Sequence, residues 1–306
     1  MSQSVGVIIP VFNRKKILLR CLQSVAEQTC LPARLVVCDD GSTDGSADAA
    51  EQYLLQLSPG FEWQVLRLPH RSAAAARKDG FQQVSSMDYV AFLDSDDCWP
   101  TDFLERATKT LQSEPEAVAA SADRRYVSEV PETQPTDCRP MASDPIGWFF
   151  AHGAGVASCS VFRTDAVAAA GGWVPELQTA EDAFLFSRVA ERGSWLHLRG
   201  RPVEFHVNVN DSKRSEEINL SRRHPNSHSR WAPIYEQIYH RVCSDHSRQQ
   251  RSALQRSLAY RWSAAGKQQH VLGDVVAAKK CFLRSLRWCP LQLRSYRRLA
   301  RLTFLA

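Results

Sequence analysis

Four short apolar runs alternate with helical patterns in the first 93 residues of this 306-residue chain. We expect the runs to be strands, because strands that are buried on both faces lose the polar alternation of exposed ones. The strands are expected at Val5–Phe12, Leu35–Cys38, Trp63–Leu68 and Tyr89–Leu93. A first helix is expected directly after Asn13, which would cap it, and two more over Ala47–Leu57 and Ala73–Val84. This rhythm predicts an α/β fold with a doubly wound, mainly parallel sheet and helices on both faces.

Acidic side chains follow two of these strands. Asp39 and Asp40 come after the second strand, and Asp94, Asp96 and Asp97 come after the fourth. In an open α/β sheet the carboxyl ends of the strands are where ligands bind. Three carboxylates within four residues repel one another unless a cation or solvent separates them. The triplet therefore predicts a site for Mg²⁺ or Mn²⁺, and the alternative is a solvated acidic turn that caps a following helix.

Several other classes of site are disfavoured. The chain has no G-x-G-x-x-G after its first strand, no G-x-x-x-x-G-K-[ST] and no G-x-S-x-G, so dinucleotide oxidoreductases, P-loop NTPases and α/β-hydrolases are poor candidates. Its nine cysteines include no C-x-x-C pair, and Cys21, Cys38 and Cys159 lie among apolar residues. We expect buried free thiols rather than a disulfide framework or a zinc site.

Four segments in order resemble the successive signatures of glycosyltransferase family 2. They are VIIPVFNR at 7–14, VCDDGSTDGS at 37–46, HRSAAAARKDG at 70–80 and FLDSDD at 92–97. The third departs from the family pattern, with Lys78 where Asn is usual and Ser72 where Gly is usual. The resemblance covers about residues 4–210 and implies the GT-A fold and an inverting nucleotide-sugar glycosyltransferase.

The resemblance also implies a role for each part of the donor site. Pro10 and Phe12 would line the pocket for the base, and Asp40, with Asp39 beside it, would accept a hydrogen bond from the base. Arg77 would lie near the base or the diphosphate. The residues alone leave alternatives open, since an Asx-turn before a helix would also explain Asp39 and Asp40, and a solvated helix face would explain Arg77.

By the same resemblance, the acidic triplet binds the ribose and the metal. Asp94 would face the ribose, with Ser95 next to it in the donor site. Asp96, together with Asp94 and Asp97, would hold Mn²⁺ or Mg²⁺, and His206 would reach the metal or the diphosphate. A divalent cation there neutralises the negative charge that develops on a departing diphosphate. A purely structural role is the alternative for His206.

Glu181 and Asp182 precede a predicted helix over Ala183–Arg192. The resemblance implies that Asp182 is the catalytic base and Glu181 its partner. Inversion requires a base within reach of the acceptor hydroxyl, on the face opposite the departing nucleotide. The alternative is that both carboxylates only complement the dipole of the helix.

The middle of the chain carries weaker patterns. They predict a helix at Pro100–Leu111, strands at Val118–Val127 and Pro202–His206, a loop at Ser128–Asp144, and an aromatic helix at Ile146–Phe150 that packs on the core or lines an acceptor cleft. We expect a glycosyltransferase domain at 1–223, with a donor half at 1–100 and an acceptor half at 101–223. A helical extension at 224–306 would follow it.

The extension is strongly basic. Residues 248–306 hold thirteen lysines and arginines against Asp274 alone. Helices are expected at Trp231–Val242 and Leu254–Ala264. The run 273–290 resembles the second helix of a tetratricopeptide hairpin, with an apolar stripe at Val275, Ala278, Phe282 and Leu286. A basic helical tail favours peripheral association with an anionic membrane, and the alternative is an ordinary helical cap. No nucleic-acid motif accompanies the charge, so nucleic acid is not an expected partner.

Together these features predict a metal-dependent inverting enzyme. It would move one sugar from a nucleotide-diphosphate sugar, with UDP-sugars first, to a hydroxyl of a saccharide or lipid-linked acceptor in cell-surface polysaccharide synthesis. The family's processive members carry Gln-x-x-Arg-Trp and membrane helices, which we do not find, so we expect single-sugar transfer. A secretory signal peptide has a basic segment before its apolar run. No such segment precedes the first apolar run here, so a cytoplasmic location is expected. The alternatives are a sugar-phosphate nucleotidyltransferase and a catalytically degenerate scaffold.

Overall fold

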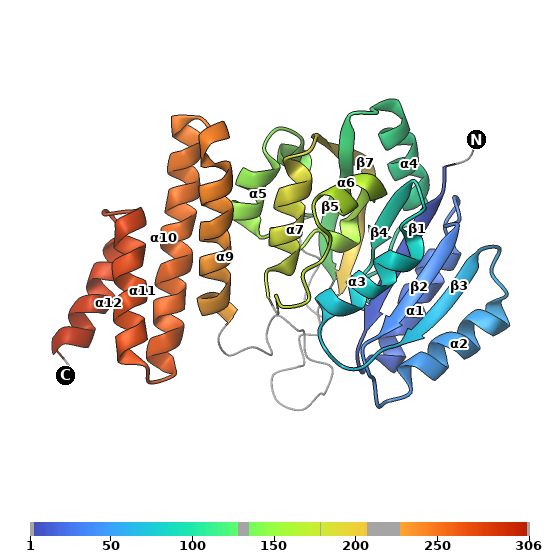
Figure 1. Cartoon of the computed structure of the whole chain (residues 1–306), viewed down its shortest axis with the longest axis horizontal. Coiled ribbons are helices and arrows are strands. Elements are labelled where there is room, and N and C mark those ends of the chain that lie inside the picture. The colour runs from blue at the N-terminus through green and yellow to red at the C-terminus, as the bar shows by residue number, and fades with distance from the viewer. Residues whose placement is uncertain (1–2, 128–134, 178, 207–226, 305–306) are drawn as a thin grey trace. The chain divides into compact units, whose positions relative to one another are not determined.

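A seven-stranded sheet forms the core of the first of two units in the computed structural model (Figure 1). The structure describes residues 3–127, 135–177, 179–206 and 227–304. The strands are β1 (Val5–Val11), β2 (Arg34–Asp39), β3 (Glu62–Arg67), β4 (Tyr89–Phe92), β5 (Ala117–Val127), β6 (Ser160–Arg163) and β7 (Ser194–His206). Their order is β3-β2-β1-β4-β6-β5-β7, and only β6 runs antiparallel to its neighbours. The predicted mainly parallel α/β sheet is confirmed.

Helices connect the strands of the first unit. They are α1 (Lys15–Ala26), α2 (Ser46–Leu57), α3 (Ala73–Val84), α4 (Phe103–Ser113), α6 (Thr164–Ala169) and α7 (Glu181–Ala190), with short 3₁₀ turns η1 (Arg139–Ala142) and η2 (Ala157–Cys159). The expected helices after the first three strands are confirmed, and α3 begins and ends at the predicted residues. Within the predicted loop at Ser128–Asp144, residues 128–134 lie outside the described part, and η1 occupies part of the remainder.

Helix α3 packs very closely on the sheet. A Cβ atom at Gly80 would lie 2.6 Å from the Sγ of Cys38 on β2 and 2.8 Å from the Cγ2 of Ile8 on β1. Real Cβ atoms do not approach neighbours that closely, so the lack of a side chain at this position permits the packing. Arg77 lies one turn earlier on the same helix, and the close packing therefore sets its position relative to the sheet edge.

The predicted helix cap at Asn13 is wrong. Arg14 precedes α1 without capping it, and the first N–H of the helix, that of Lys15, donates to Asp44 at 2.9 Å. Asn13 instead has a φ of +52°, and its side-chain oxygen accepts a hydrogen bond of 2.8 Å from the backbone N–H of Thr43. Its own N–H donates to the hydroxyl of Ser42 at 2.8 Å. Asn tolerates the left-handed conformation, so the residue ties the end of β1 to the loop after β2 instead of starting a helix.

The second unit is helical and consists of residues 146–154 and the described helices from Ser227 onward. They are α5 (Pro145–His152), α9 (Ser227–Val242), α10 (Arg248–Val271), α11 (Val275–Trp288) and α12 (Leu293–Phe304), with a 3₁₀ turn η3 (Cys243–Asp245). Helices α9, α10, α11 and α12 pack side by side in that order (Figure 1). The position of the predicted boundary at residue 223 lies outside the described part. None of the described helices combines the length and apolar character needed to cross a bilayer.

The aromatic segment Ile146–Phe150 belongs to this second unit rather than to the half of the chain in which we placed it. Its side chains are buried, and the ring of Phe150 packs edge-on against Tyr235 at 5.1 Å. The predicted core face of α10 is confirmed, because Leu254, Leu258 and Trp262 are all buried.

The predicted stripe on α11 is only partly correct. Ala278 and Phe282 are buried, but Val275 is exposed. Val275 lies in the first turn after the Asp274 cap, beyond the part of the helix that its neighbours cover. Ser285 is buried on the packed side instead, because its hydroxyl donates to a carbonyl of α10 at 2.6 Å.

All nine cysteines lie in the described part of the chain and are free. Cys21, Cys38 and Cys159 are fully buried, as expected from their apolar surroundings. Burial raises the pKa of Cys38 to about 12, so this thiol is protonated at neutral pH. The buried cysteines therefore act as small apolar core residues.

Candidate active site

The carboxyl ends of β1, β2 and β4 meet at one edge of the sheet. β1 lies between the other two strands and is parallel to both, so Val11 is paired with Asp39 and Ile8 with Phe92. The backbone N–H of Asp40 donates to Val11 at 2.9 Å. The two acidic groups predicted from the sequence therefore lie at the same sheet edge, as expected.

Asp39 and Asp40 are both buried at the end of β2. One oxygen of Asp39 accepts a hydrogen bond of 2.6 Å from the N–H of Ser42, which is the Asx-turn arrangement, but its Oδ2 is buried without a hydrogen-bond partner in the described structure. Asp40 accepts a 2.9 Å hydrogen bond from the N–H of Arg71, and its Oδ2 lies 3.0 Å from the Nδ1 of His70. The turn accounts for one oxygen of Asp39 and leaves its Oδ2 available to a ligand donor, whereas Asp40 is held by Arg71 and His70.

An aromatic pair flanks these carboxylates. The rings of Phe12 and His70 stack with centroids 4.0 Å apart and an interplanar angle of 15°. The side chain of His70 is 58% exposed, so a flat ring faces solvent directly above Asp40. Pro10 lies within β1, paired with Cys38 of β2, and supports this end of the strand. The arrangement offers a stacking surface and hydrogen-bond acceptors side by side, which is what recognition of a planar base requires.

The acidic triplet forms a tight turn after β4. The N–H of Asp97 donates to the carbonyl of Asp94 at 2.9 Å, and one oxygen atom from each of Asp94, Asp96 and Asp97 lies within 4.8 Å of the others. Ser95 is buried between them, and the Ser158 hydroxyl accepts a hydrogen bond of 3.1 Å from the N–H of Asp94. Three carboxylates therefore converge on one small volume.

Two arginines neutralise part of this charge. Arg14 pairs with Asp96 at 2.7 Å, and Arg77 pairs with Asp94 at 2.5 Å. No such partner is described for Asp97, and burial, followed by the charges of Asp96 and Asp94, raises its pKa well above the usual range. A partly buried group of carboxylates that is still short of positive charge fits a hard divalent cation with oxygen ligands. These residues therefore fit the predicted metal.

His206 ends β7 close to the triplet. Its backbone N–H donates to Asp97 at 3.3 Å, while its imidazole Nε2 is buried 3.5 Å from a carboxylate oxygen of Glu204 without a well-formed hydrogen bond. Burial, and then the charge of Arg20, lowers the pKa of His206, so the ring is neutral at physiological pH. Its role as a metal ligand stays a prediction, since its ring is not one of the groups that converge with the triplet.

Arg77 joins the triplet to the other pair of carboxylates. The residue is only 7% exposed, so the solvated-face alternative is wrong. Besides Asp94, it lies 3.5 Å from Glu181, and its guanidinium lies over the ring of Trp173 at 4.8 Å. Burial alone would lower the pKa of Arg77, but the charges of Asp94 and Glu181 outweigh it and the pKa is raised.

Glu181 and Asp182 occupy the first turn of α7. Oδ1 of Asp182 accepts a 2.6 Å hydrogen bond from the N–H of Ala183, so the carboxylate does complement the helix terminus. Burial raises the pKa of Asp182, and burial with the charge of Asp182 raises that of Glu181 to about 7. A carboxylate with a raised pKa accepts a proton more readily than an ordinary aspartate does.

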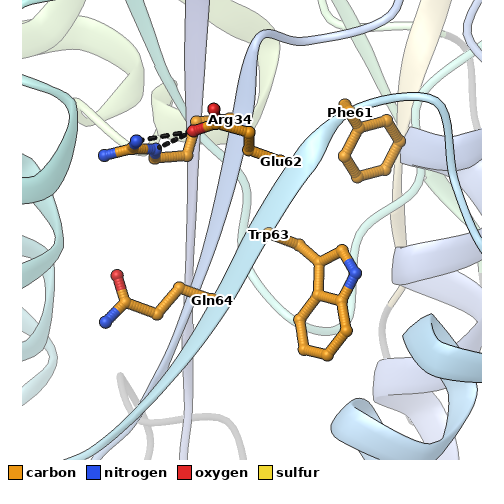
Figure 2. Close-up of a pocket in the computed structure, with 5 residues that line it drawn as sticks. All are labelled: Arg34, Phe61, Glu62, Trp63 and Gln64. Atoms are coloured by element: carbon orange, nitrogen blue, oxygen red, sulfur yellow. Dashed lines mark hydrogen bonds and ion pairs between the residues drawn. The ribbon is translucent and has the colours of Figure 1, made fainter.

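Two other places in the described part of the first unit could be considered as sites, but neither brings three carboxylates together in the way that the triplet does. Asp123, Asp137 and His197 also bring donor atoms within 4.8 Å of one another, but Arg139 pairs with Asp137 at 2.8 Å and His197 bonds to Asp123 at 3.0 Å. An open hollow of about 420 Å³ lies on the edge strand β3 (Figure 2). Its polar side chains are Arg34, Glu62 and Gln64, of which the first two pair with each other, and it contains none of the predicted site residues.

The geometry agrees with the comparisons to known proteins. The family model for "Glycosyl transferase family 2" matches residues 6–168. The chain belongs to glycosyltransferase family 2. Among its family-2 relatives, "Glycosyltransferase GlyG" of Streptococcus pneumoniae is 28% identical over 112 residues, which is 37% of this chain and 36% of that protein. "Putative glycosyltransferase EpsH" of Bacillus subtilis is 27% identical over 135 residues, 44% of this chain and 37% of that protein. The chain thus matches a little over a third of the length of these curated relatives.

Solved structures show the same fold. The S. aureus TarS 1-349 complex with UDP-GlcNAc superposes with a TM-score of 0.66 and 16% identity, over 92% of this chain and 81% of that one. The mannosyltransferase PcManGT from Pyrobaculum calidifontis, in complex with GDP-Man and Mn²⁺, has a TM-score of 0.59 and 18% identity, over 100% and 81%. The family-2 chain described here therefore has the GT-A fold.

Sequence reasoning missed three residues at this site. Arg14 is the last residue of the first family-2 segment, and its positive charge beside a strand end was the available clue. His70 begins the third segment, but nothing in the sequence indicated that its ring would stack on Phe12. Ser158 supports Asp94 from η2, more than sixty residues away, and no local pattern announces it.

Proposed function

We propose that this chain is a metal-dependent inverting glycosyltransferase. It transfers one sugar from a nucleotide-diphosphate sugar, with UDP-sugars as first candidates, to a hydroxyl of a saccharide or lipid-linked acceptor. The observation that carries the proposal is the convergence of Asp94, Asp96 and Asp97 at the sheet edge where Asp40 lies beside the Phe12–His70 pair. TarS with UDP-GlcNAc and PcManGT with GDP-Man and Mn²⁺ support a nucleotide-sugar donor for this fold.

In this proposal the base of the donor lies against Phe12 and His70, and Asp39 and Asp40 accept its hydrogen bonds. Asp94 faces the ribose. Asp94, Asp96 and Asp97 hold Mn²⁺ or Mg²⁺, which supplies positive charge beside the diphosphate leaving group. Arg77 adds fixed positive charge from the side of Glu181.

Asp182 takes the proton of the acceptor hydroxyl in the proposed reaction. Its raised pKa suits it to this task, and the hydrogen bond from Ala183 fixes the direction of one oxygen and leaves the other available. The hydroxyl oxygen then bonds to the anomeric carbon as the bond to the diphosphate breaks, with inversion. The proposed setting is polysaccharide synthesis on the cytoplasmic side of a membrane.

The test is calorimetric titration of UDP with Mn²⁺ into the wild type, an Asp96→Asn variant and a Glu116→Gln control that removes an exposed carboxylate elsewhere. We expect binding that requires Mn²⁺, a loss of at least about tenfold in Asp96→Asn, and no change in the control. GDP is titrated in parallel. Binding of GDP but not UDP would change the donor class. Binding of neither nucleotide by the folded protein would contradict the proposal and favour a scaffold.

A further inference from the structure

The positive charge of the chain is concentrated in α10, α11 and α12. Residues 248–306 have a formal charge of +12, whereas the whole chain has +5, so the preceding part is net negative. The asymmetry does not serve ion pairing within the unit, because among the described ion pairs this segment contributes only Arg284, which pairs with Glu236. It indicates that this unit meets an anionic partner.

Some of the arginines are used in packing. The guanidinium of Arg261 lies over Tyr235 at 3.6 Å and donates to a carbonyl of α5 at 3.0 Å. Arg284 pairs with Glu236 at 2.9 Å, and Arg298 donates to the carbonyl of Ser263 at 3.0 Å. These three residues join neighbouring helices of the second unit and are not available to a partner.

Most of the remaining basic side chains are exposed. Six that are exposed, none of which forms an ion pair with a described residue, are Lys267, Lys280, Arg287, Arg294, Arg297 and Arg301. On α12 the last three are spaced by three and four residues, so they form one stripe. Opposite the stripe, Ser295 and Leu302 are buried against the other helices. The basic stripe is therefore the outer surface of α12.

Exposed apolar side chains are also concentrated in this part of the chain. Of thirteen large hydrophobic residues that are exposed in the described part, nine lie between 260 and 296: Tyr260, Val271, Leu272, Val275, Val276, Leu283, Leu291, Leu293 and Tyr296. On α11, Val276, Lys280, Leu283 and Arg287 follow one another at spacings of four, three and four, which places them on one side of the helix. Exposed aliphatic residues gathered in one region normally mark a binding surface.

We propose that the exposed face of α11 and α12 docks on an anionic lipid surface. Aliphatic side chains between lysines and arginines are the pattern of helices that lie in the membrane interface, where the apolar groups enter the headgroup boundary and the long basic side chains reach the phosphates. Two copies that met through this same face would bring like charges together, and a nucleic acid would leave the valines and leucines without a partner. The inference does not depend on the proposed function.

The experiment is co-sedimentation of the full chain with vesicles of phosphatidylcholine alone or with about 30 mol% phosphatidylglycerol. Three variants are compared: Arg287→Gln/Arg294→Gln/Arg297→Gln, Val276→Gln/Leu283→Gln, and a control, Lys16→Gln/Lys109→Gln/Arg199→Gln, that removes the same charge from exposed sites in the first unit. All substitutions are at exposed positions, and thermal unfolding checks that each variant is folded.

We expect the wild type and the control to bind only the anionic vesicles. Removing three charges from the docking face should weaken binding by about a hundredfold, and removing the two aliphatic side chains by about tenfold. Equal binding to neutral vesicles, or equal losses in the control and the charge variant, would overturn the proposal. The proposal would also be overturned if, without lipid, the sedimentation coefficient of the wild type rose with protein concentration and that of the aliphatic variant did not. That result would indicate self-association through this face.

Discussion

Arg77 is the residue at which the two groups of carboxylates meet. Its guanidinium contacts Asp94 after β4 and Glu181 at the start of α7, and it lies over Trp173. A lysine could supply the charge, but a planar guanidinium can serve two carboxylates and an aromatic face at once. Arg77 therefore links the predicted donor side to the predicted base.

At the scale of single residues, the proposed base gives a direct prediction. Asp182→Asn should lower turnover by about 10²- to 10⁴-fold, because an amide cannot accept the proton, while binding of UDP with Mn²⁺ stays within about twofold. Donor turnover is measured with acceptor present, beside calorimetry. Asp165→Asn is a matched control: it also lies in the first turn of a helix, and its Oδ1 accepts a 2.7 Å bond from the next N–H. Retained turnover in Asp182→Asn would refute the assignment.

The individual site residues could be predicted where a local motif carries them. Asp39, Asp40 and the triplet were located correctly at one sheet edge because strand ends are readable from apolar runs. The partners of these residues could not be predicted in the same way. Arg14, just before α1, and Ser158, in η2, reach the triplet only through the three-dimensional arrangement of the chain.

At the scale of elements, the close packing of α3 makes a prediction about stability. Gly80→Ala should destabilise the fold by about 1–3 kcal/mol, because the new methyl group overlaps Cys38 and Ile8, even though alanine favours a helix by up to about 1 kcal/mol. Urea unfolding measures the change. Gln82→Ala, at an exposed position of the same helix, should be neutral or slightly stabilising. If the two variants changed the free energy of unfolding by the same amount, α3 would be able to move away from the sheet.

The elements themselves were largely predictable from hydrophobic periodicity. Strands β1 to β4 and helices α2 and α3 were predicted to within two residues, because continuous apolar runs and helical spacing separate well in a doubly wound sheet. The antiparallel β6 was missed, since its four residues, SVFR, form no continuous apolar run like that of β4. The grouping of 146–154 with the helices from 227 onward was also missed, because nothing local identifies a segment that packs on helices far along the chain.

At the scale of the whole molecule, the pKa of Glu181 predicts a pH-dependent stability. An unfolded glutamate ionises near pH 4.5, whereas the folded one ionises near 7. The folded state therefore binds more protons between these values, and the wild type should lose stability relative to Glu181→Gln as pH rises from about 4.5 to 7, by at most on the order of 3 kcal/mol. Urea unfolding at pH 5, 6, 7 and 8 measures the difference. A difference that is constant with pH would contradict the raised pKa.

Two arginine–aspartate pairs occupy carboxylates of the proposed metal site. A divalent cation that bound Asp94 and Asp96 would displace the guanidinium groups that now neutralise them. The displaced Arg14 and Arg77 are partly or fully buried, so each needs a new anion nearby. A diphosphate supplies that anion, which makes the exchange balanced in charge only when cation and nucleotide arrive together. Each should therefore bind weakly alone and strengthen the binding of the other.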